Sequence, residues 1–235
     1  MAGRRGLLRA FGALSAILVL AALIGLGIWQ VQRLAWKKDL IARVDARLSA
    51  VEVPAPGPEA WAGLNDSNAE YLRVMLSGTY LPGRDTLVQA VTARGAGFWV
   101  MTPMQTPDGW IALVNRGFVP SDARSDYPAP VAGPTTVSGL LRMTQPKGAF
   151  LRSNDPADGR WYSRDTQAIG ATLGLSNVAP WFIDAKAETG ADTLPVGGLT
   201  VVQFRNSHLG YAFTWFGLAV LWAGTLIYLG RKRRG

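Results

Sequence analysis

The sequence predicts a membrane protein of the α+β class in which two transmembrane helices flank a β-rich extracytoplasmic domain. Two uncharged hydrophobic runs, Ala10–Trp29 and Leu209–Gly230, lie near the ends of the 235-residue chain. Between Tyr71 and Phe204, short apolar or alternating segments are separated by turn residues. This pattern is typical of an antiparallel sheet or a partly closed barrel. Both tails are basic, whereas the middle of the chain is nearly neutral.

The first hydrophobic run is long enough to cross a bilayer, because about 20 helical residues extend about 30 Å. A cleaved signal peptide is the alternative, but its apolar core would measure about 7–15 residues and end at a small-residue cleavage site. Here Ala21-Ala22 lies inside the run, which continues directly into Trp29-Gln30. We therefore expect an uncleaved transmembrane helix over residues 10–31, preceded by a basic tail at residues 1–9.

The second run, about 22 residues and about 33 Å of helix, predicts a transmembrane helix over residues 209–230, with a basic tail at 231–235. Seven of the 24 Lys and Arg residues lie in the two tails, which leaves 17 against all 16 Asp and Glu. The net charge of +8 is thus a topology signal and does not indicate a nucleic-acid partner. The positive-inside rule places both tails in the cytoplasm and residues 32–208 outside.

Between the two spans the sequence predicts a helical extension followed by strands. Apolar residues at helical spacing continue the first helix to about Ala50, and the prolines from Pro54 to Pro58 then end it. One short helix is predicted over Thr166–Leu173, with Asp165 as its N-cap. The predicted strands are Arg73–Leu81, Thr86–Thr92, Phe98–Gln105, Trp110–Phe118, Val137–Leu141, Trp181–Ala187 and Leu199–Phe204.

The residue types exclude most catalytic sets. The chain has no cysteine, so thiolate nucleophiles and disulfides are absent. A Ser-His-Asp mechanism needs an imidazole beside the nucleophile, and the single histidine of the chain, His208, lies at the membrane edge. A membrane-tethered Ser-Lys hydrolase using Lys147 or Lys186 is an alternative, and it requires a desolvated lysine.

Two polar motifs in the central domain are interpreted as structural. Asn154–Gly159 contains calcium-loop residue types, but the Asp spacing misses that pattern and the composition is that of a turn. Asn115-Arg116-Gly117 follows a strongly apolar segment and is expected to form the corner at the end of that strand.

His208 is the first candidate site residue. On a helix, His208, Tyr211, Ala212 and Trp215 fall at i, i+3, i+4 and i+7 and share one face. A histidine at this depth is either an interfacial polar anchor or an axial metal ligand.

The outer end of the first span carries matching residues. Trp29 and Trp36 lie there, with Gln30 and Arg33 beside them. One interpretation is an aromatic belt with basic anchors. The other is a cofactor pocket at the outer rim of two packed helices, where Gly25 and Gly27 permit close approach.

Four stretches, spread over nearly the whole chain, carry a family resemblance. They are Leu26-Gly27-Ile28-Trp29-Gln30 through Arg33, Trp36-Lys37 and Leu40-Ile41; Val114-Asn115-Arg116-Gly117-Phe118-Val119-Pro120; Gly139-Leu140-Leu141-Arg142 with Asn154 and Trp161-Tyr162 to Asp165; and Arg205-Asn206-Ser207-His208-Leu209 with Tyr211-Ala212 and Trp215-Phe216. In this order they resemble the Surfeit-locus (Surf/Shy) family of assembly factors of haem-copper cytochrome c oxidase, and the two-span layout agrees. Phe118 stands where many members have tryptophan, and Ser207 where a second asparagine is usual.

The resemblance implies a non-enzymatic chaperone that binds haem a as cargo and delivers it to nascent oxidase subunit I. The family's haem-binding histidine matches His208. Beside it we expect Trp29, Tyr211 and Trp215 to line the haem, and Arg33 and Arg205 to hold its propionates, since guanidinium groups bind carboxylates bidentately. A scaffold that clamps the assembling subunit without binding haem is the alternative function.

The resemblance also implies a setting and partners. The partners would be subunit I, the haem a synthesis machinery and membrane lipid. The long N-terminal extension of mitochondrial members is missing, which favours a bacterial inner membrane. One histidine and no cysteine exclude bis-His ligation by one chain. The haem would therefore be five-coordinate, share a histidine in a homo-oligomer, or take its second ligand from a partner.

Overall fold

The computed structural model describes residues 2–147, 152–187, 193–200, 204 and 206–232. It contains two compact units, one of residues 1–44 with 203–235 and one of residues 45–202. We call the first the helix pair and the second the barrel domain. Helix α1 (Ala2–Ser49) belongs to the helix pair except for its last residues, and α3 (His208–Lys232) completes that pair.

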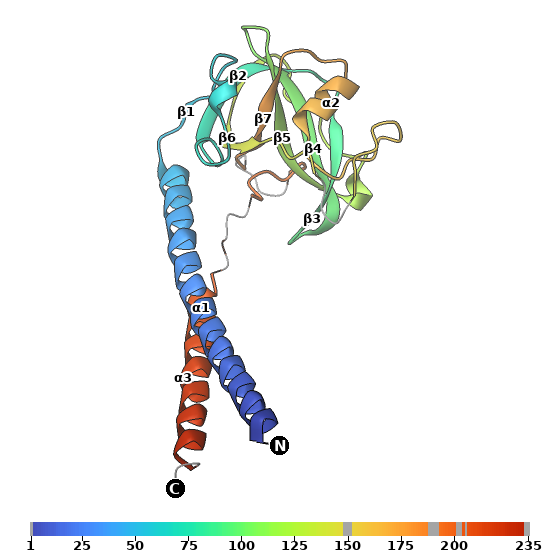
Figure 1. Cartoon of the computed structure of the whole chain (residues 1–235). Coiled ribbons are helices and arrows are strands. Elements are labelled where there is room, and N and C mark those ends of the chain that lie inside the picture. The colour runs from blue at the N-terminus through green and yellow to red at the C-terminus, as the bar shows by residue number, and fades with distance from the viewer. Residues whose placement is uncertain (1, 148–151, 188–192, 201–203, 205, 233–235) are drawn as a thin grey trace. The chain divides into compact units, whose positions relative to one another are not determined.

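Five strands of the barrel domain form a closed barrel (Figure 1) in the order β2-β6-β7-β5-β4, and β4 pairs with β2 to close it. The closing pairs are Thr79 with Gln105 and Tyr80 with Met104. The barrel strands are β2 (Arg73–Tyr80), β4 (Gly95–Gln105), β5 (Ile111–Pro120), β6 (Pro134–Met143) and β7 (Val178–Ala185). Closure removes the exposed edges that an open sheet would present.

Two further strands extend the barrel sheet: β1 (Val53–Pro54) beside β2, and β3 (Thr86–Thr92) beside β4. Most neighbours are antiparallel, as predicted, but β1 pairs with β2 in parallel, and within the barrel β5 pairs with β7 in parallel. Parallel neighbours need a long crossover, and the chain between them contains β6 and the helix α2 (Thr166–Thr172).

Apolar residues pack on both faces of the barrel wall. The interior cluster draws on all five barrel strands and includes Trp110, Trp181, Ile183, Leu141 and Val74. A second cluster, which includes Phe182, Leu113 and Ile169, lies on the opposite face beneath α2. Successive strand residues point to opposite faces, so Ile183 and Phe182 belong to different clusters.

The sequence predicted most elements of the barrel domain. Strand β3 has the predicted bounds. The bounds of β2, β4, β5, β6 and β7 agree with those of the predicted strands to within a few residues. Asp165 caps α2 as predicted, because its carboxylate accepts hydrogen bonds from the backbone N–H of Gln167 and Ala168, both at 3.1 Å. The short strand β1 was not predicted.

The predicted strand over Leu199–Phe204 is wrong where it can be compared. Leu199, Thr200 and Phe204 have no regular structure, and residues 201–203 lie outside the described part of the chain. The barrel is closed without these residues, by the pairing of β2 with β4.

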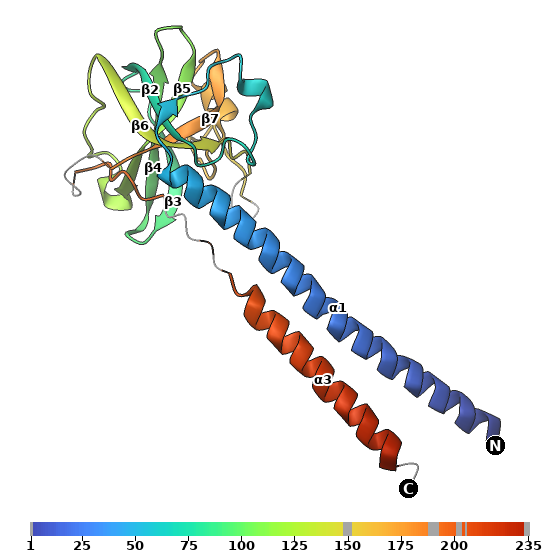
Figure 2. The ribbon, with the colours of Figure 1, turned by 90° about the vertical axis from the view of Figure 1, so that its left-hand side faces the viewer.

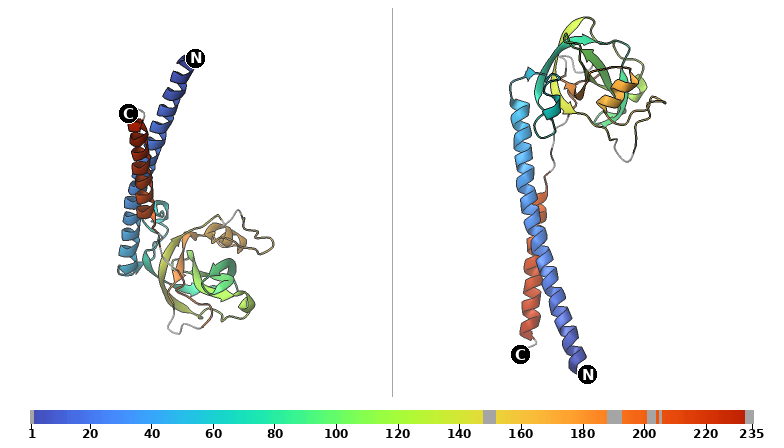
Figure 3. Two further views of the ribbon diagram at one scale, coloured as in Figure 1. Left: turned by 90° about the horizontal axis from the view of Figure 1, so that it is seen from below. Right: turned by 45° about the horizontal axis from the view of Figure 1, so that its top comes forward.

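Both predicted spans lie within helices that are long and apolar enough to cross a bilayer. The predicted extension of the first helix is confirmed, since α1 continues to Ser49. Helices α1 and α3 run alongside each other, with the N- and C-terminal ends of the chain at the same end of the pair (Figures 2 and 3). This arrangement is the one required of two spans with both tails on one side of a membrane.

Candidate functional site

Small residues bring the two helices of the pair close together. Gly27 faces α3, and a Cβ atom built on it would lie 2.6 Å from Cε1 of Phe216. Ala212 and Ala219 of α3 are buried, and the less exposed positions of α1 recur at residues 16, 20, 23, 27 and 30. This spacing of three and four is that of one helix face packed on a neighbour. Gly25, the other glycine expected at the contact, has open space around it.

His208 begins α3 at the end of this seam and makes one side-chain hydrogen bond across it. Its Nδ1 lies 2.7 Å from Oε1 of Gln30. Gln30 is only 8% exposed, and His208 is partly buried. An amide oxygen only accepts hydrogen bonds, so Nδ1 donates its proton and the lone pair of neutral His208 is on Nε2.

This geometry fits a metal-binding histidine. Histidine ligands donate their second ring N–H to an acceptor, which fixes the tautomer and the ring orientation. His208 meets that condition through Gln30, and its Nε2 has no protein partner among the described residues. A haem iron approaching from that side would meet a lone pair.

Four of the five other predicted haem contacts, Trp29, Arg33, Tyr211 and Trp215, lie near this end of the pair. Trp29 is 52% exposed and Tyr211 is 56% exposed, while Trp215 is partly buried. Arg33 is exposed, and its guanidinium stacks on Trp36 at 3.8 Å from the ring centroid. Arg205 lies outside the described residues. The roles of these five side chains toward haem stay predictions.

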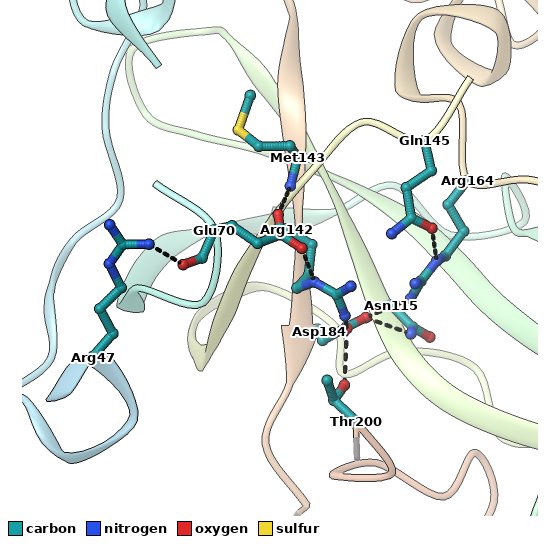
Figure 4. A network of polar contacts seen from close by, with 9 residues as sticks. All are labelled: Arg47, Glu70, Asn115, Arg142, Met143, Gln145, Arg164, Asp184 and Thr200. Carbon is teal, nitrogen blue, oxygen red and sulfur yellow. Dashed lines mark hydrogen bonds and ion pairs between the residues drawn. The ribbon is translucent and has the colours of Figure 1, made fainter. Parts of the chain in front are cut away.

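The barrel domain contains a second polar cluster, centred on Asp184 of β7 (Figure 4). This carboxylate is 4% exposed. It accepts hydrogen bonds from Nδ2 of Asn115 at 2.7 Å, Nη1 of Arg142 at 2.8 Å, Nη1 of Arg164 at 3.0 Å and Oγ1 of Thr200 at 2.8 Å. Four donors saturate the two oxygens of a carboxylate.

The two arginines of the cluster share this carboxylate but differ in their other partners. Arg142 also donates through Nε to Oε1 of Glu70 at 2.6 Å, whereas Nε of Arg164 donates to the neutral amide of Gln145 at 3.1 Å. Burial lowers the pKa of Arg142, but the carboxylates of Asp184 and Glu70 outweigh it and raise that pKa above its usual range. Burial lowers the pKa of Arg164, and the nearby charge of Arg142 lowers it further. The charged groups of this cluster are therefore paired with one another and with neighbouring polar side chains.

The two motifs interpreted as structural have that role. Asn115 binds Asp184, and its Oδ1 also accepts from the N–H of Gly117 at 3.2 Å, which supports the corner. Asn154 orders its loop by accepting from the backbone N–H groups of Tyr162 and Ser163. The described residues contain no group of side chains arranged to hold a metal ion.

The Ser-Lys hydrolase hypothesis lacks its physical basis. Both candidate bases, Lys147 and Lys186, are exposed. The desolvation that this mechanism requires of its lysine is therefore missing at both positions.

Sequence reasoning did not find the partners of the two key side chains. Gln30 was noted only as a neighbour of Trp29, although a glutamine at the end of an apolar helix needs a partner. Asp184 follows Trp181-Phe182-Ile183 within a strand, and a lone acid in such a run signals a buried, paired charge.

The fold and the site define a class of membrane-anchored proteins in which two apolar helices accompany a small closed β-barrel. The model of the SURF1 family matches residues 17–220. The chain is 35% identical to Surfeit locus protein 1 of Mus musculus over 221 residues, which covers 86% of this chain and 70% of the mouse protein. For Surfeit locus protein 1 of Homo sapiens the identity is 32% over 223 residues, with 86% and 72% covered. For the SURF1-like protein of Monosiga brevicollis it is 34% over 224 residues, with 88% and 83% covered.

The chain belongs to the SURF1 family, the family of cytochrome c oxidase assembly factors. The family resemblance inferred from the four sequence stretches is thereby confirmed.

Replacing the central carboxylate should destabilise the barrel domain. Asp184→Asn leaves Arg142 and Arg164 buried with too little negative charge, and breaking such a buried pairing costs about 3–5 kcal/mol. Thermal unfolding of the purified protein should show a large fall in midpoint. Asp158→Asn is the control, because Asp158 lies on the surface in an exposed pair with Arg160 and should leave the midpoint unchanged. An equal effect of both variants would contradict this account.

Filling the space at Gly27 should loosen the helix pair. Gly27→Val places methyl groups where the Phe216 ring lies, and overpacking of this kind costs about 1–3 kcal/mol. Gly25→Val is the matched control, since nothing lies within 4 Å of its Cβ position. Because the chain has no native cysteine, cysteine pairs introduced across α1 and α3 report helix proximity without background. Gly27→Val should reduce their cross-linking, whereas Gly25→Val should not.

Proposed function

We propose that the protein is an assembly factor for haem-copper cytochrome c oxidase that binds haem a at the outer end of the helix pair and delivers it to nascent subunit I. The observation that carries this proposal is the His208–Gln30 hydrogen bond, 2.7 Å long. It orients the only histidine of the chain so that Nε2 is available as an axial ligand. Membership in the SURF1 family supplies the oxidase context.

The residues near His208 fit a large, mostly apolar ligand with acidic substituents. Trp29 and Tyr211 offer exposed aromatic surface on α1 and α3, and Trp215 follows His208 by two helical turns. In this proposal they contact the macrocycle, while Arg33 and Arg205 bind the propionates. When bound, the haem supplies the iron centre that subunit I requires, and the chain itself performs no reaction.

The protein is proposed to reside in a bacterial inner membrane, with both tails cytoplasmic and residues 32–208 periplasmic. The basic tails and the common end of the two helices support this topology. The partners are subunit I, the machinery that makes haem a, and the surrounding lipid. A dimer is one way to supply a second axial ligand.

Substitution of the proposed ligand tests the haem proposal. His208→Ala should abolish or strongly change the visible spectrum of protein purified from cells that make haem a, because the chain has no other strong ligand. Membrane insertion should persist, since insertion depends on the summed apolar length and a rim histidine contributes little. Tyr228→Ala, on α3 near its opposite end, is the control and should keep the spectrum. Unchanged haem content and spectrum in His208→Ala would refute axial ligation, and a colourless wild-type protein that still co-purifies with subunit I would favour the scaffold.

Reporter fusions test the topology. Alkaline phosphatase is active only outside the cytoplasm, so its fusion after Ala187 should be active and its fusion after Lys232 should be inactive. A cytoplasmic reporter such as green fluorescent protein should give the opposite pattern at the same two positions. An active phosphatase after Lys232 would contradict the placement of both tails in the cytoplasm.

A further inference from the structure

The hydrogen bond between Gln30 and His208 has an uncharged acceptor. The acceptor is the neutral side-chain amide of Gln30 at 2.7 Å, whereas many metal-binding histidines donate to a carboxylate, which carries a negative charge. An amide oxygen accepts a hydrogen bond from Nδ1–H but is too weak a base to pull the proton toward itself. The imidazole therefore remains a neutral and only moderately basic ligand. A carboxylate at the same place would give the ring imidazolate character and a stronger bond from Nε2 to iron.

Packing holds Gln30 in place to act on His208. Gln30 is 8% exposed, and Ala212, one turn after His208, is 4% exposed. Gly27, one turn before Gln30 on α1, lies against Phe216. The hydrogen bond thus lies at the end of an apolar seam, where competing water is reduced and a polar contact is strengthened.

We infer that Gln30 is a positioning residue: it fixes His208 as the Nδ1–H tautomer, presents Nε2 as the single metal-binding nitrogen, and keeps the bond to iron weak enough for the cargo to leave. Gln30 itself does not touch the iron in this arrangement. The part of the inference that concerns iron rests on the proposed haem-binding function, but the tautomer belongs to the protein alone.

The tautomer is measurable without haem, because the chain contains one histidine. Protein labelled with ¹⁵N-histidine gives only two ring-nitrogen signals, which are recorded well above the ordinary histidine pKa of about 6.5. The wild type should show a protonated Nδ1 and a pyridine-type Nε2. Gln30→Leu should lose that state and shift toward the Nε2–H tautomer, which a histidine side chain without a partner prefers. Gln32→Leu is the matched control, since Gln32 is exposed on α1, and should match the wild type.

The haem-loaded protein provides the second readout. Gln30→Leu should weaken haem retention by about 10- to 100-fold, the usual effect of losing such a partner, while Gln32→Leu should not. Gln30→Glu keeps an acceptor but adds a charge, so it should raise the iron–histidine stretching frequency in resonance Raman spectra and slow haem transfer to an apo-acceptor.

The two hypotheses fail separately. A protonated Nε2 in the wild-type apo-protein overturns the role of Gln30, whatever the haem data show. A correct tautomer together with an unchanged haem spectrum in His208→Ala refutes the haem ligand and leaves the positioning of the ring intact. An unaltered stretching frequency in Gln30→Glu, in a protein whose ligand is His208, overturns the claim that the amide keeps the bond weak.

Discussion

A polar side chain between apolar helices must find a partner, and in this protein that requirement joins Gln30 to His208. Only one other hydrogen bond joins α1 and α3 in the described residues: Trp222 Nε1 donates to the carbonyl of Ala16 at 3.0 Å. The two bonds are separated by 14 residues on each helix (30 − 16 and 222 − 208), or about 21 Å. Equal separations on antiparallel helices fix one register, with Gly27 and Phe216 packed between them. The register in turn places the histidine beside its acceptor.

Buried polar side chains must find partners in the barrel domain too, and there the partners are charged groups of the same cluster. Asp184, Arg142, Arg164 and Glu70 are mostly buried charges, and each is satisfied by protein partners. Two carboxylates balance two guanidinium groups, so the cluster has no need of a bound ion. Such a network specifies how β5, β6 and β7 meet, because a shift of one strand would leave a charge unpaired. The barrel cluster is therefore structural, whereas in the helix pair Nε2 of His208 has no protein partner within the part of the chain that the structure describes.

The sequence predicted what depends on local pattern. Strand β3, the Asp165 cap and both apolar helices follow from periodicity and capping within short windows. His208 is a candidate because it is the only histidine of the chain and lies at the edge of the second apolar run. What the sequence did not predict depends on long-range contacts. Gln30 and His208 are 178 residues apart, and Asn115 and Asp184 are 69 apart, so no local pattern pairs them. The parallel pairing of β5 with β7 likewise depends on which strands close the barrel.

If the helix pair binds haem as proposed, its residue types would suit a carrier better than a resident haem protein. A resident haem gains from two axial ligands and an enclosing pocket, which raise its affinity and slow its loss. This chain offers one histidine, an amide as that histidine's partner, and two aromatic side chains, Trp29 and Tyr211, that are more than half exposed. If the protein binds haem as proposed, each of these features would lower the free energy released on binding. His208 would hold the group through Nε2 alone, and a second ligand would have to come from another chain. The chain would thus favour release through the weakness of its own site, without a source of energy to expel the haem.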